Sequence, residues 1–321
     1  QLNTSVTPIT LNNIELVNVT AVAGAGTLGL ANAGQVTQVT NYGSTAAVTV
    51  SGIAADADLV VASTTSNTTF GYASTTGTQS ANLTLNNVTS AAGVTIAGIE
   101  TINITSSGSV ANSATLTAAA ATTVNVAGAQ DLTLAGAAVA TLIDATDFTG
   151  DLTAGLTVAG TLNGGSGDDA LTGGDSVAAV ISGNDGDDTI NAGAESSGTH
   201  SDNMDGGLGD DLINYGTTLN IEAADSINGG EGFDTLRAAD DEFIGSPALT
   251  NVSNIEAIAV STALGGNITL SQIQAGIEQV DLEAGLTGAA RTITFDSGVD
   301  ATVNLSIANG QAMVVAAAGT G

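Results

Sequence analysis

Apolar and polar residues alternate with a period of two over much of the chain, in short runs separated by glycine or asparagine. Clear runs are Val48–Val50, Leu83–Leu85, Val124–Val126 and Leu132–Leu134. These runs are rich in valine, leucine and threonine, a composition that favours half-buried β-strands. The pattern therefore predicts many short strands and no long amphipathic helix, with at most a helical turn in residues 269–282.

A nine-residue unit repeats in the middle of the chain. Four clear copies fit Gly-Gly-x-Gly-x-Asp-x-aliphatic-x, with Asn184 as the one departure: residues 164–172, 183–191, 206–214 and 229–237. Glycine at positions one, two and four allows a tight turn with positive φ. Positions seven to nine form a short strand whose aliphatic side chain at position eight points inward. Because one copy cannot bury that side chain alone, the copies must stack, which predicts a parallel β-roll with two copies in each coil.

Weaker copies lie between the clear ones, at 155–163, 173–181, 197–205 and 220–228. All the copies together predict these inward aliphatics: Leu162, Leu171, Val180, Ile190, Met204, Ile213, Ile227 and Leu236. Successive strands alternate between the two sides of a roll, so the clear copies fall on one side and the weak copies on the other. We call these sides the strong row and the weak row. The insertions at 192–196 and 215–219 both precede weak-row turns.

The aspartate at position six gives the repeat its chemistry. Calcium is a hard cation that takes about six to eight oxygen ligands, and two stacked turns can supply them where one cannot. We expect a well-formed calcium row at the strong-row aspartates Asp169, Asp188, Asp211 and Asp234. In the looser weak row, Asp202 and Asp225 are the best ligands. Further candidate metal ligands are Asp185 and the position-four residues Gly167, Gly186, Gly209 and Gly232.

A second motif occurs on both sides of the repeat: a turn residue, then Ile-Glu, then alternating aliphatics. Its four copies span residues 13–19, 98–104, 254–260 and 276–282. In one interpretation the motif starts a strand in a solenoid coil, and its glutamate faces solvent or caps a turn. In the other, the glutamates are extra calcium ligands: Glu15, Glu100, Glu256 and Glu278. Its occurrence on both flanks favours one long stacked assembly.

The charge of the chain is strongly negative. Its 321 residues carry a formal net charge of −30 with only two basic residues, and 18 of the 32 acidic residues lie between 164 and 242. This clustering favours metal binding and predicts a metal-free state destabilised by self-repulsion, with folding coupled to calcium. Nucleic acid is excluded as a partner, because nothing on the chain could neutralise phosphates.

The remaining composition narrows the class of protein. Cysteine is absent, so no disulfide framework exists. Aromatic residues make up 2% of the chain, so we expect a narrow core of small aliphatics. Residues 101–130 lack charge but are rich in Thr, Ser and Asn, so no transmembrane span is predicted. The chain begins at Gln1 without a basic-plus-apolar signal, which suggests a fragment or a processed product.

No catalytic site is expected. The single histidine, His200, lies in a weak-row turn and is interpreted as a solvated surface residue. No zinc-protease helix, nucleophile elbow or phosphate-binding loop is present. Paired acids such as Asp187 and Asp188 resemble the carboxylate pairs of glycosidases. Their place in the repeat explains them more simply, because the second aspartate of each pair occupies position six.

The nonapeptides identify residues 164–237 as similar to RTX proteins, and the Thr/Ala/Val-rich flanks without lysine or cysteine resemble RTX-type bacterial surface-layer proteins. This resemblance implies type I secretion from a Gram-negative bacterium, folding in extracellular calcium, and a lattice on the cell surface. The expected fold is all-β: a right-handed parallel β-roll or β-solenoid with calcium-stacked turns, flanked by further β-solenoid-like strands. The expected regions are residues 1–154, a β-solenoid-like part; 155–238, the calcium β-roll; and 239–321, a β-rich C-terminal part.

Three functions compete at this point. The favoured one is a structural subunit that binds Ca²⁺, is secreted to the cell surface, and assembles with itself into a lattice or filament, with cell-surface polysaccharide as a possible anchor. The second is the stalk of an RTX adhesin, which predicts a calcium-rigidified monomer. The third is the non-catalytic C-terminal part of a type I-secreted enzyme, whose catalytic residues would precede Gln1.

Overall fold

The computed structural model describes residues 10–136, 140–175, 177–193, 200–217, 221–244, 249–288, 290–305 and 313–317. The chain is an all-β parallel β-solenoid of about 13 turns with almost no helix, which confirms the predicted fold class. It divides into two compact units, Gln1–Gly167 and Asp168–Gly321. The division into regions 1–154, 155–238 and 239–321 stays a prediction.

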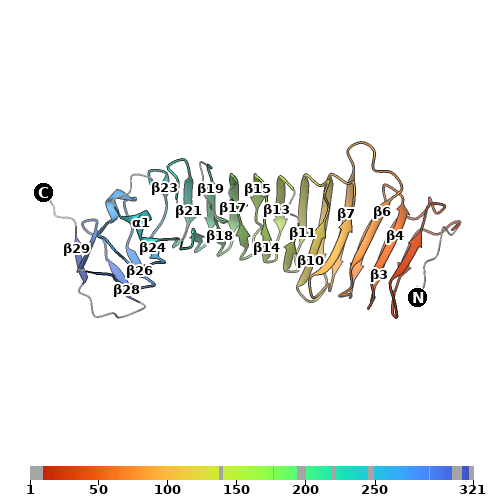
Figure 1. The fold of residues 1–321 in the computed structure, drawn as a ribbon, viewed down its shortest axis with the longest axis horizontal. Coiled ribbons are helices and arrows are strands. Elements are labelled where there is room, and N and C mark those ends of the chain that lie inside the picture. The colour runs from red at the N-terminus through yellow and green to blue at the C-terminus, as the bar shows by residue number, and fades with distance from the viewer. Residues whose placement is uncertain are drawn as a thin grey trace. The chain divides into compact units, whose positions relative to one another are not determined.

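In the first unit, successive strands alternate between two parallel sheets (Figure 1). One sheet contains β1 (Leu16–Val19), β3 (Gln38–Tyr42), β5 (Asp58–Ala62), β7 (Ser80–Asn86), β9 (Thr101–Ser107), β11 (Thr123–Gly128), β13 (Leu142–Phe148) and β15 (Gly160–Asn163). The other contains β2 (Gly26–Gly29), β4 (Val48–Ile53), β6 (Thr68–Tyr72), β8 (Ala92–Ile96), β10 (Asn112–Thr117), β12 (Leu132–Ala135) and β14 (Leu152–Gly155). The strands predicted from alternation are therefore confirmed as β4, β7, β11 and β12.

The second unit contains the strand of each clear repeat, and its strands alternate between two parallel sheets in the same way. Strong-row copies form strands of one sheet, which contains β16 (Ala170–Thr172), β18 (Thr189–Asn191), β20 (Leu212–Asn214), β22 (Thr235–Ala238), β24 (Ala257–Val260), β26 (Gln279–Leu282) and β28 (Thr302–Leu305). The opposite sheet contains β17 (Ala179–Asp185), β19 (Asn203–Leu208), β21 (Ser226–Glu231) and β23 (Val252–Ser253). The predicted alternation of strong and weak copies is confirmed.

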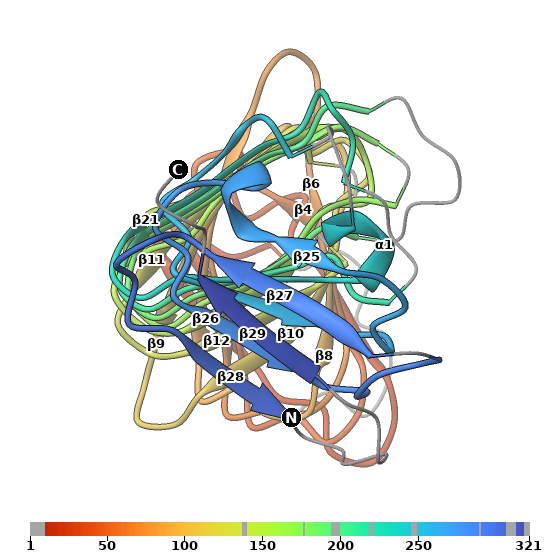
Figure 2. The ribbon, with the colours of Figure 1, turned by 90° about the vertical axis from the view of Figure 1, so that its left-hand side faces the viewer.

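Short elements complete this unit. A small sheet, seen face on in Figure 2, contains β25 (Ile268–Thr269), β27 (Arg291–Phe295) and β29 (Met313–Ala317). The helical turn expected in 269–282 is the 3-10 helix η1 (Leu270–Gln272), and the short α1 (Asp240–Phe243) was not predicted. In the described part of the chain, no helix combines the length and apolar character needed to cross a membrane.

Inward side chains of neighbouring coils stack in register to make the core. In the first unit, Val39 is the register partner of Leu59, which is in turn the partner of Leu83. All three side chains are buried. Parallel pairing places equivalent positions of successive coils about 4.8 Å apart on the same face. Each aliphatic therefore packs against its counterparts in the adjacent coils, which is why small side chains fill this narrow interior.

Seven of the predicted inward aliphatics of the repeat are buried, namely Leu162, Leu171, Ile190, Met204, Ile213, Ile227 and Leu236. The eighth prediction, Val180, is wrong. Val180 is 43% exposed and Ile181 is buried in its place, as the register partner of Met204. The weak copy assigned to 173–181 therefore runs one residue later than its glycines suggested, so Ala179 rather than Ala178 occupies the aspartate position.

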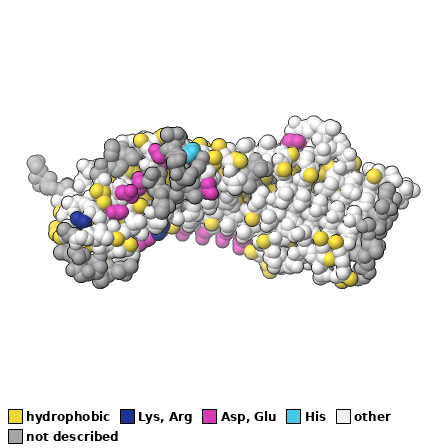
Figure 3. Space-filling model, viewed as in Figure 1, with side chains coloured by type: hydrophobic (Ala, Val, Ile, Leu, Met, Phe, Trp, Pro, Cys, Tyr) yellow, Lys and Arg dark blue, Asp and Glu magenta, His cyan; other side chains and the backbone are white. Residues whose placement is uncertain are grey.

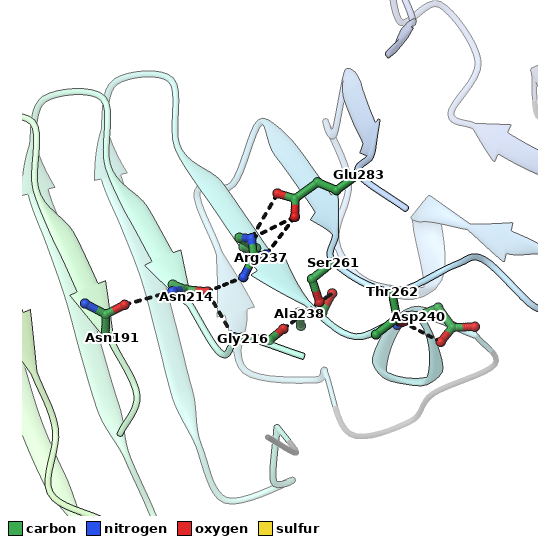
Figure 4. Close-up of polar contacts among 9 residues, drawn as sticks. All are labelled: Asn191, Asn214, Gly216, Arg237, Ala238, Asp240, Ser261, Thr262 and Glu283. Carbon is green, nitrogen blue, oxygen red and sulfur yellow. Dashed lines mark hydrogen bonds and ion pairs between the residues drawn. The ribbon is translucent and has the colours of Figure 1, made fainter. Parts of the chain in front are cut away.

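Outward positions carry hydrogen-bonded ladders of amide side chains. In the first unit, Asn125 donates to Asn103 at 2.8 Å, Asn103 donates to Asn82 at 2.9 Å, and Asn82 donates to Asp58 at 3.0 Å. The second unit has a similar ladder, drawn in Figure 4, from Asn191 through Asn214 to Arg237, which forms a 2.6 Å ion pair with Glu283. The ladders give the coils that they join a polar contact with one another.

Candidate metal centre

The strong-row aspartates form one buried line in the second unit. Each of them directly precedes a strand, so the turn and the strand register together fix its position. Their exposed fractions are 2% for Asp169, 1% for Asp188, 2% for Asp211 and 0% for Asp234. Aspartates are seldom this deeply buried without a partner, so their surroundings reveal the chemistry of the row.

One carboxylate oxygen of each aspartate connects neighbouring coils. The backbone N–H of Asp169 donates to Oδ1 of Asp188 at 2.7 Å, and that of Asp188 donates to Oδ1 of Asp211 at 2.8 Å. The N–H of Asp211 likewise donates to Oδ1 of Asp234 at 2.8 Å. Each turn is thereby held by the aspartate of the following coil.

The second carboxylate oxygen has no donor in three of the four aspartates. Oδ2 of Asp188, Asp211 and Asp234 is buried without a hydrogen-bond partner. A buried carboxylate oxygen without a partner is costly. These three atoms therefore favour a positively charged ligand in the strong row.

Backbone carbonyl oxygens lie beside these unpartnered atoms. A Cβ built on Gly183 would lie within 2.5 Å of both Oδ2 of Asp188 and the carbonyl oxygen of Gly206. The same holds at Gly206 for Asp211 and the carbonyl of Gly229. Two acceptor oxygens face the same point there, and no protein donor reaches the Oδ2 atom of the carboxylate. A cation satisfies such an arrangement.

The glycines of the repeat serve two different purposes. Positions two and four have positive φ as predicted, for example 120° at Gly207 and 128° at Gly209, and Asn184 adopts 79°. The prediction is wrong for position one, because Gly183, Gly206 and Gly229 do not have positive φ. Position one requires glycine because any side chain there would collide with the carboxylate and the neighbouring carbonyl.

The first clear copy also departs from the predicted turn. Neither Gly165 nor Gly167 has positive φ.

The position-four glycines of the later copies stack closely. A Cβ on Gly209 would collide with the carbonyl oxygen of Gly186, and a Cβ on Gly232 would collide with that of Gly209. These carbonyls therefore point along the row toward the next coil.

Burial controls the protonation of the row. It raises the pKa of Asp188 from its ordinary 3.8 to about 8 and that of Asp211 to about 7, and it raises the pKa of Asp234 as well. Backbone hydrogen bonds oppose these shifts, and neighbouring carboxylates add to them. Without a cation, the carboxyls of Asp188 and Asp211 therefore retain protons close to neutral pH.

The weak-row aspartates Asp202 and Asp225 are buried too, and protein donors reach both carboxylate oxygens of Asp225. Oδ1 of Asp202 accepts the N–H of Ala179 at 2.8 Å, and Oδ1 of Asp225 accepts the N–H of Asp202 at 2.9 Å. Oδ2 of Asp225 accepts the N–H of Glu222 at 2.8 Å and the hydroxyl of Tyr215 at 3.4 Å. Both oxygens of Asp225 are thus satisfied without a metal. The insertions 192–196 and 215–219 lie partly outside the described residues.

Other acids of the repeat are exposed. Asp168, Asp187 and Asp210, at position five, form a second line in which each accepts the N–H of the position-five residue of the next coil at 2.8–2.9 Å. Asp185 is also exposed and lines a groove of about 460 Å³ over β17, β19 and β21, together with Asn254. Figure 3 shows acidic side chains following one another along one edge.

The Ile-Glu glutamates cap turns at two of their four positions. Oε2 of Glu100 accepts the N–H of Gln79 at 2.8 Å, and Oε2 of Glu256 accepts the N–H of Asp234 at 2.9 Å. Each of the four glutamates directly precedes a strand. The interpretation of the motif as a strand start with a capping glutamate is confirmed for these two. The sequence analysis missed that Glu256 continues the strong row. The signal was its position directly before a strand, which it shares with the strong-row aspartates.

The donor set in the strong row fits a hard cation held largely by backbone. Among the described residues, no three His, Cys, Asp or Glu side chains converge on one point. Carbonyl oxygens such as those of Gly206 and Gly229 would therefore complete the ligand set around single carboxylates, as calcium accepts. No protein family, curated protein or solved structure was found to match the chain.

Proposed function

We propose that this chain is a structural, calcium-dependent protein of the bacterial cell surface, which assembles with itself in the manner of RTX-type surface-layer proteins. The observation that carries the proposal is the set of three buried carboxylate oxygens without donors, on Asp188, Asp211 and Asp234, each beside a backbone carbonyl. Secretion, the cell-surface location and kinship with RTX proteins rest on the nonapeptide pattern.

Calcium explains these three positions better than a proton does. A proton on Oδ2 would make that oxygen a donor to one acceptor, such as the neighbouring carbonyl oxygen, and would neutralise a single charge. A divalent cation attracts both oxygens and offsets the like charges that follow one another along the row. When bound, calcium would link successive coils and neutralise part of the net charge of −30. The strong row would then replace the disulfides that the chain lacks.

Exposed apolar side chains on the last described strands support self-assembly, and the charge of the chain makes us expect that it depends on calcium. Among the described residues, β28 pairs with β26 alone and β29 with β27 alone. These edge strands carry exposed apolar side chains, including Leu305 at 40% and Val314 at 51%. An exposed apolar edge is a template for pairing with another chain. Copies with a charge of −30 repel one another, so we expect assembly to require bound calcium.

Electron microscopy of the purified chain with and without calcium tests this function. We expect ordered sheets or filaments at millimolar calcium, and their dissolution when EGTA removes the metal. A monomer that binds calcium and becomes rigid without assembling would overturn the lattice function and favour the adhesin stalk. A chain that binds no calcium would overturn both.

A further inference from the structure

We infer that the strong row has one more cation site than the nonapeptides by themselves can build, closed by the non-repeat turn Asn254–Glu256. This inference rests on the proposed calcium function and extends it to residues outside the repeat. The site lies between the last clear copy and the coil that follows it. Its oxygens come from Asp234, in the repeat, and from Asn254, outside it.

The strand register places Asn254 in line with the position-one glycines of the repeat. Gly183, Gly206 and Gly229 follow equivalent strand positions in successive coils, because Ser182 pairs with Asp205 and Asp205 pairs with Asn228. Asn228 pairs in turn with Ser253. Asn254 therefore occupies the place in its coil that the position-one glycine occupies in the coils before it.

Two oxygens, Oδ2 of Asp234 and the carbonyl oxygen of Asn254, converge at this position. A Cβ built on Gly229 would lie within 2.5 Å of both Oδ2 of Asp234 and the carbonyl oxygen of Asn254. The carbonyl of Asn254 thus takes the place that Gly206 and Gly229 fill in the two preceding sites. Oδ2 of Asp234 is buried without a hydrogen-bond partner, in a residue with 0% exposure.

Glu256 caps the turn that contains Asp234. Glu256 does for Asp234 what each aspartate does for the one before it, because its Oε2 accepts the N–H of Asp234 at 2.9 Å. The carbonyl of Asp234 accepts the N–H groups of Glu256 and Ala257 in return. The turn from Asn254 to Glu256 is shorter than that from Gly229 to Asp234, and the longer glutamate side chain spans the difference.

The backbone of Asn254 has a positive φ. Its φ of 53° is in the left-handed region, as is the 79° of Asn184 in the repeat. This conformation sets the direction of the Asn254 peptide groups, and asparagine tolerates it better than most residues. The side chain also donates to Asn228 at 2.7 Å, which ties the turn to the preceding coil. The turn is thus held in place before any cation arrives.

The row ends at this site. Asp169, Asp188, Asp211 and Asp234 each have their N–H bonded to the carboxylate of the following coil. The N–H of Glu256 instead bonds to the backbone oxygen of Asp234, and no carboxylate beyond it continues the pattern in the described residues. The strong row accordingly contains three cation sites, at Asp188, Asp211 and Asp234, and the third depends on Asn254.

Native mass spectrometry of the full chain in calcium chloride tests the third site. We expect three tightly bound ions in the strong row of the wild-type chain. Gly229→Ala would fill the third site with a methyl group and lower the count by one. Its matched control, Gly34→Ala, places a methyl group in open space and keeps the count.

A second pair of variants tests the turn without filling the site. Asn254→Gly and Asn254→Val both lose the hydrogen bond to Asn228, but only valine resists positive φ. We expect Asn254→Val to lose one ion and Asn254→Gly to keep it. Thermal unfolding in EGTA then shows whether each variant folds without metal to the same extent as the wild type.

The outcomes separate this inference from the proposed function. If the wild type binds calcium and both Gly229→Ala and Asn254→Val retain its full count, the third site does not exist while the calcium function stands. If the wild type binds no calcium at all, the proposed function itself fails. A count that falls by one in both variants supports the site.

Discussion

Both rows of the repeat bury aspartates, but the carboxylate oxygens of these aspartates have different surroundings. In the strong row, Oδ2 of Asp188, Asp211 and Asp234 has no donor and faces a backbone carbonyl. In the weak row, Asp225 receives an N–H from Asp202, an N–H from Glu222 and the hydroxyl of Tyr215. A buried aspartate therefore does not by itself indicate a metal site. What distinguishes Asp225 from these three strong-row aspartates is that the protein supplies donors to both of its carboxylate oxygens.

The difference also explains the sequence divergence between the rows. Any side chain on Gly183, Gly206 or Gly229 would collide with a carboxylate and with a carbonyl of the next coil, so the strong row brings these oxygens together only with glycine at position one. A turn stabilised by its own donors has no such requirement. The weak-row turns can therefore lose glycines and change length, as their sequences do.

Calcium removal should produce the largest effect and should act through the strong row. Each occupied site contributes about 2.7 kcal/mol when free calcium is roughly 100-fold above Kd. The free energy that three such sites contribute together, about 8 kcal/mol, lies within the total stability of a typical domain, about 5–15 kcal/mol. Hydrogen exchange in EGTA should show loss of protection from β18 to β22. Unchanged protection without calcium would contradict the coupling of folding to metal.

Glycine substitution should separate the rows next. Gly206→Ala places a methyl group against Oδ2 of Asp211 and the carbonyl of Gly229, so it should abolish one strong-row site. Gly216→Ala, after the strand β20, meets no atom within 4 Å but keeps a strained φ of 71°. It should cost on the order of 1–3 kcal/mol of stability and leave calcium binding unchanged. Calorimetric titration with calcium measures both. Equal losses of binding would mean that the site is elsewhere.

Removal of a single charge should have a smaller, sharper effect. In Asp211→Asn the amide oxygen still accepts the N–H of Asp188, but the charge beside Gly206 is lost, so the calcium count should fall by one. In Asp225→Asn the count should stay constant, because Glu222 and Tyr215 already satisfy that carboxylate. Native mass spectrometry gives both counts. A larger loss in Asp225→Asn would reverse the assignment of the rows.

pH should give the smallest effect, in opposite directions with and without metal. The folded pKa values of Asp188 and Asp211, about 8 and about 7, lie above the ordinary 3.8. A raised pKa contributes stability that is full below 3.8 and is lost as pH rises toward 7 to 8. The metal-free chain should therefore melt at a lower temperature at pH 8 than at pH 5. Saturating calcium should reverse this order, because it binds the deprotonated form.

Much of this architecture follows from the sequence alone. Period-two alternation gave β4, β7, β11 and β12, and the Asp-x-aliphatic spacing gave the two rows, because stacking in register forces equivalent residues onto one face. The error at Val180 arose from an inserted residue in a turn, where glycine no longer marks the phase. The role of Glu256 depends on a shorter turn offset by a longer side chain. The unpartnered oxygens depend on which donors reach each carboxylate, which no local pattern encodes.

A crystal structure of the calcium-loaded chain, with calcium located by anomalous scattering, tests the central claim most directly. We predict three peaks in the strong row, beside Oδ2 of Asp188, Asp211 and Asp234, and none beside Asp202 or Asp225. The third peak should contact the carbonyl oxygen of Asn254. Peaks confined to the weak row, or a strong row without any, would contradict the account.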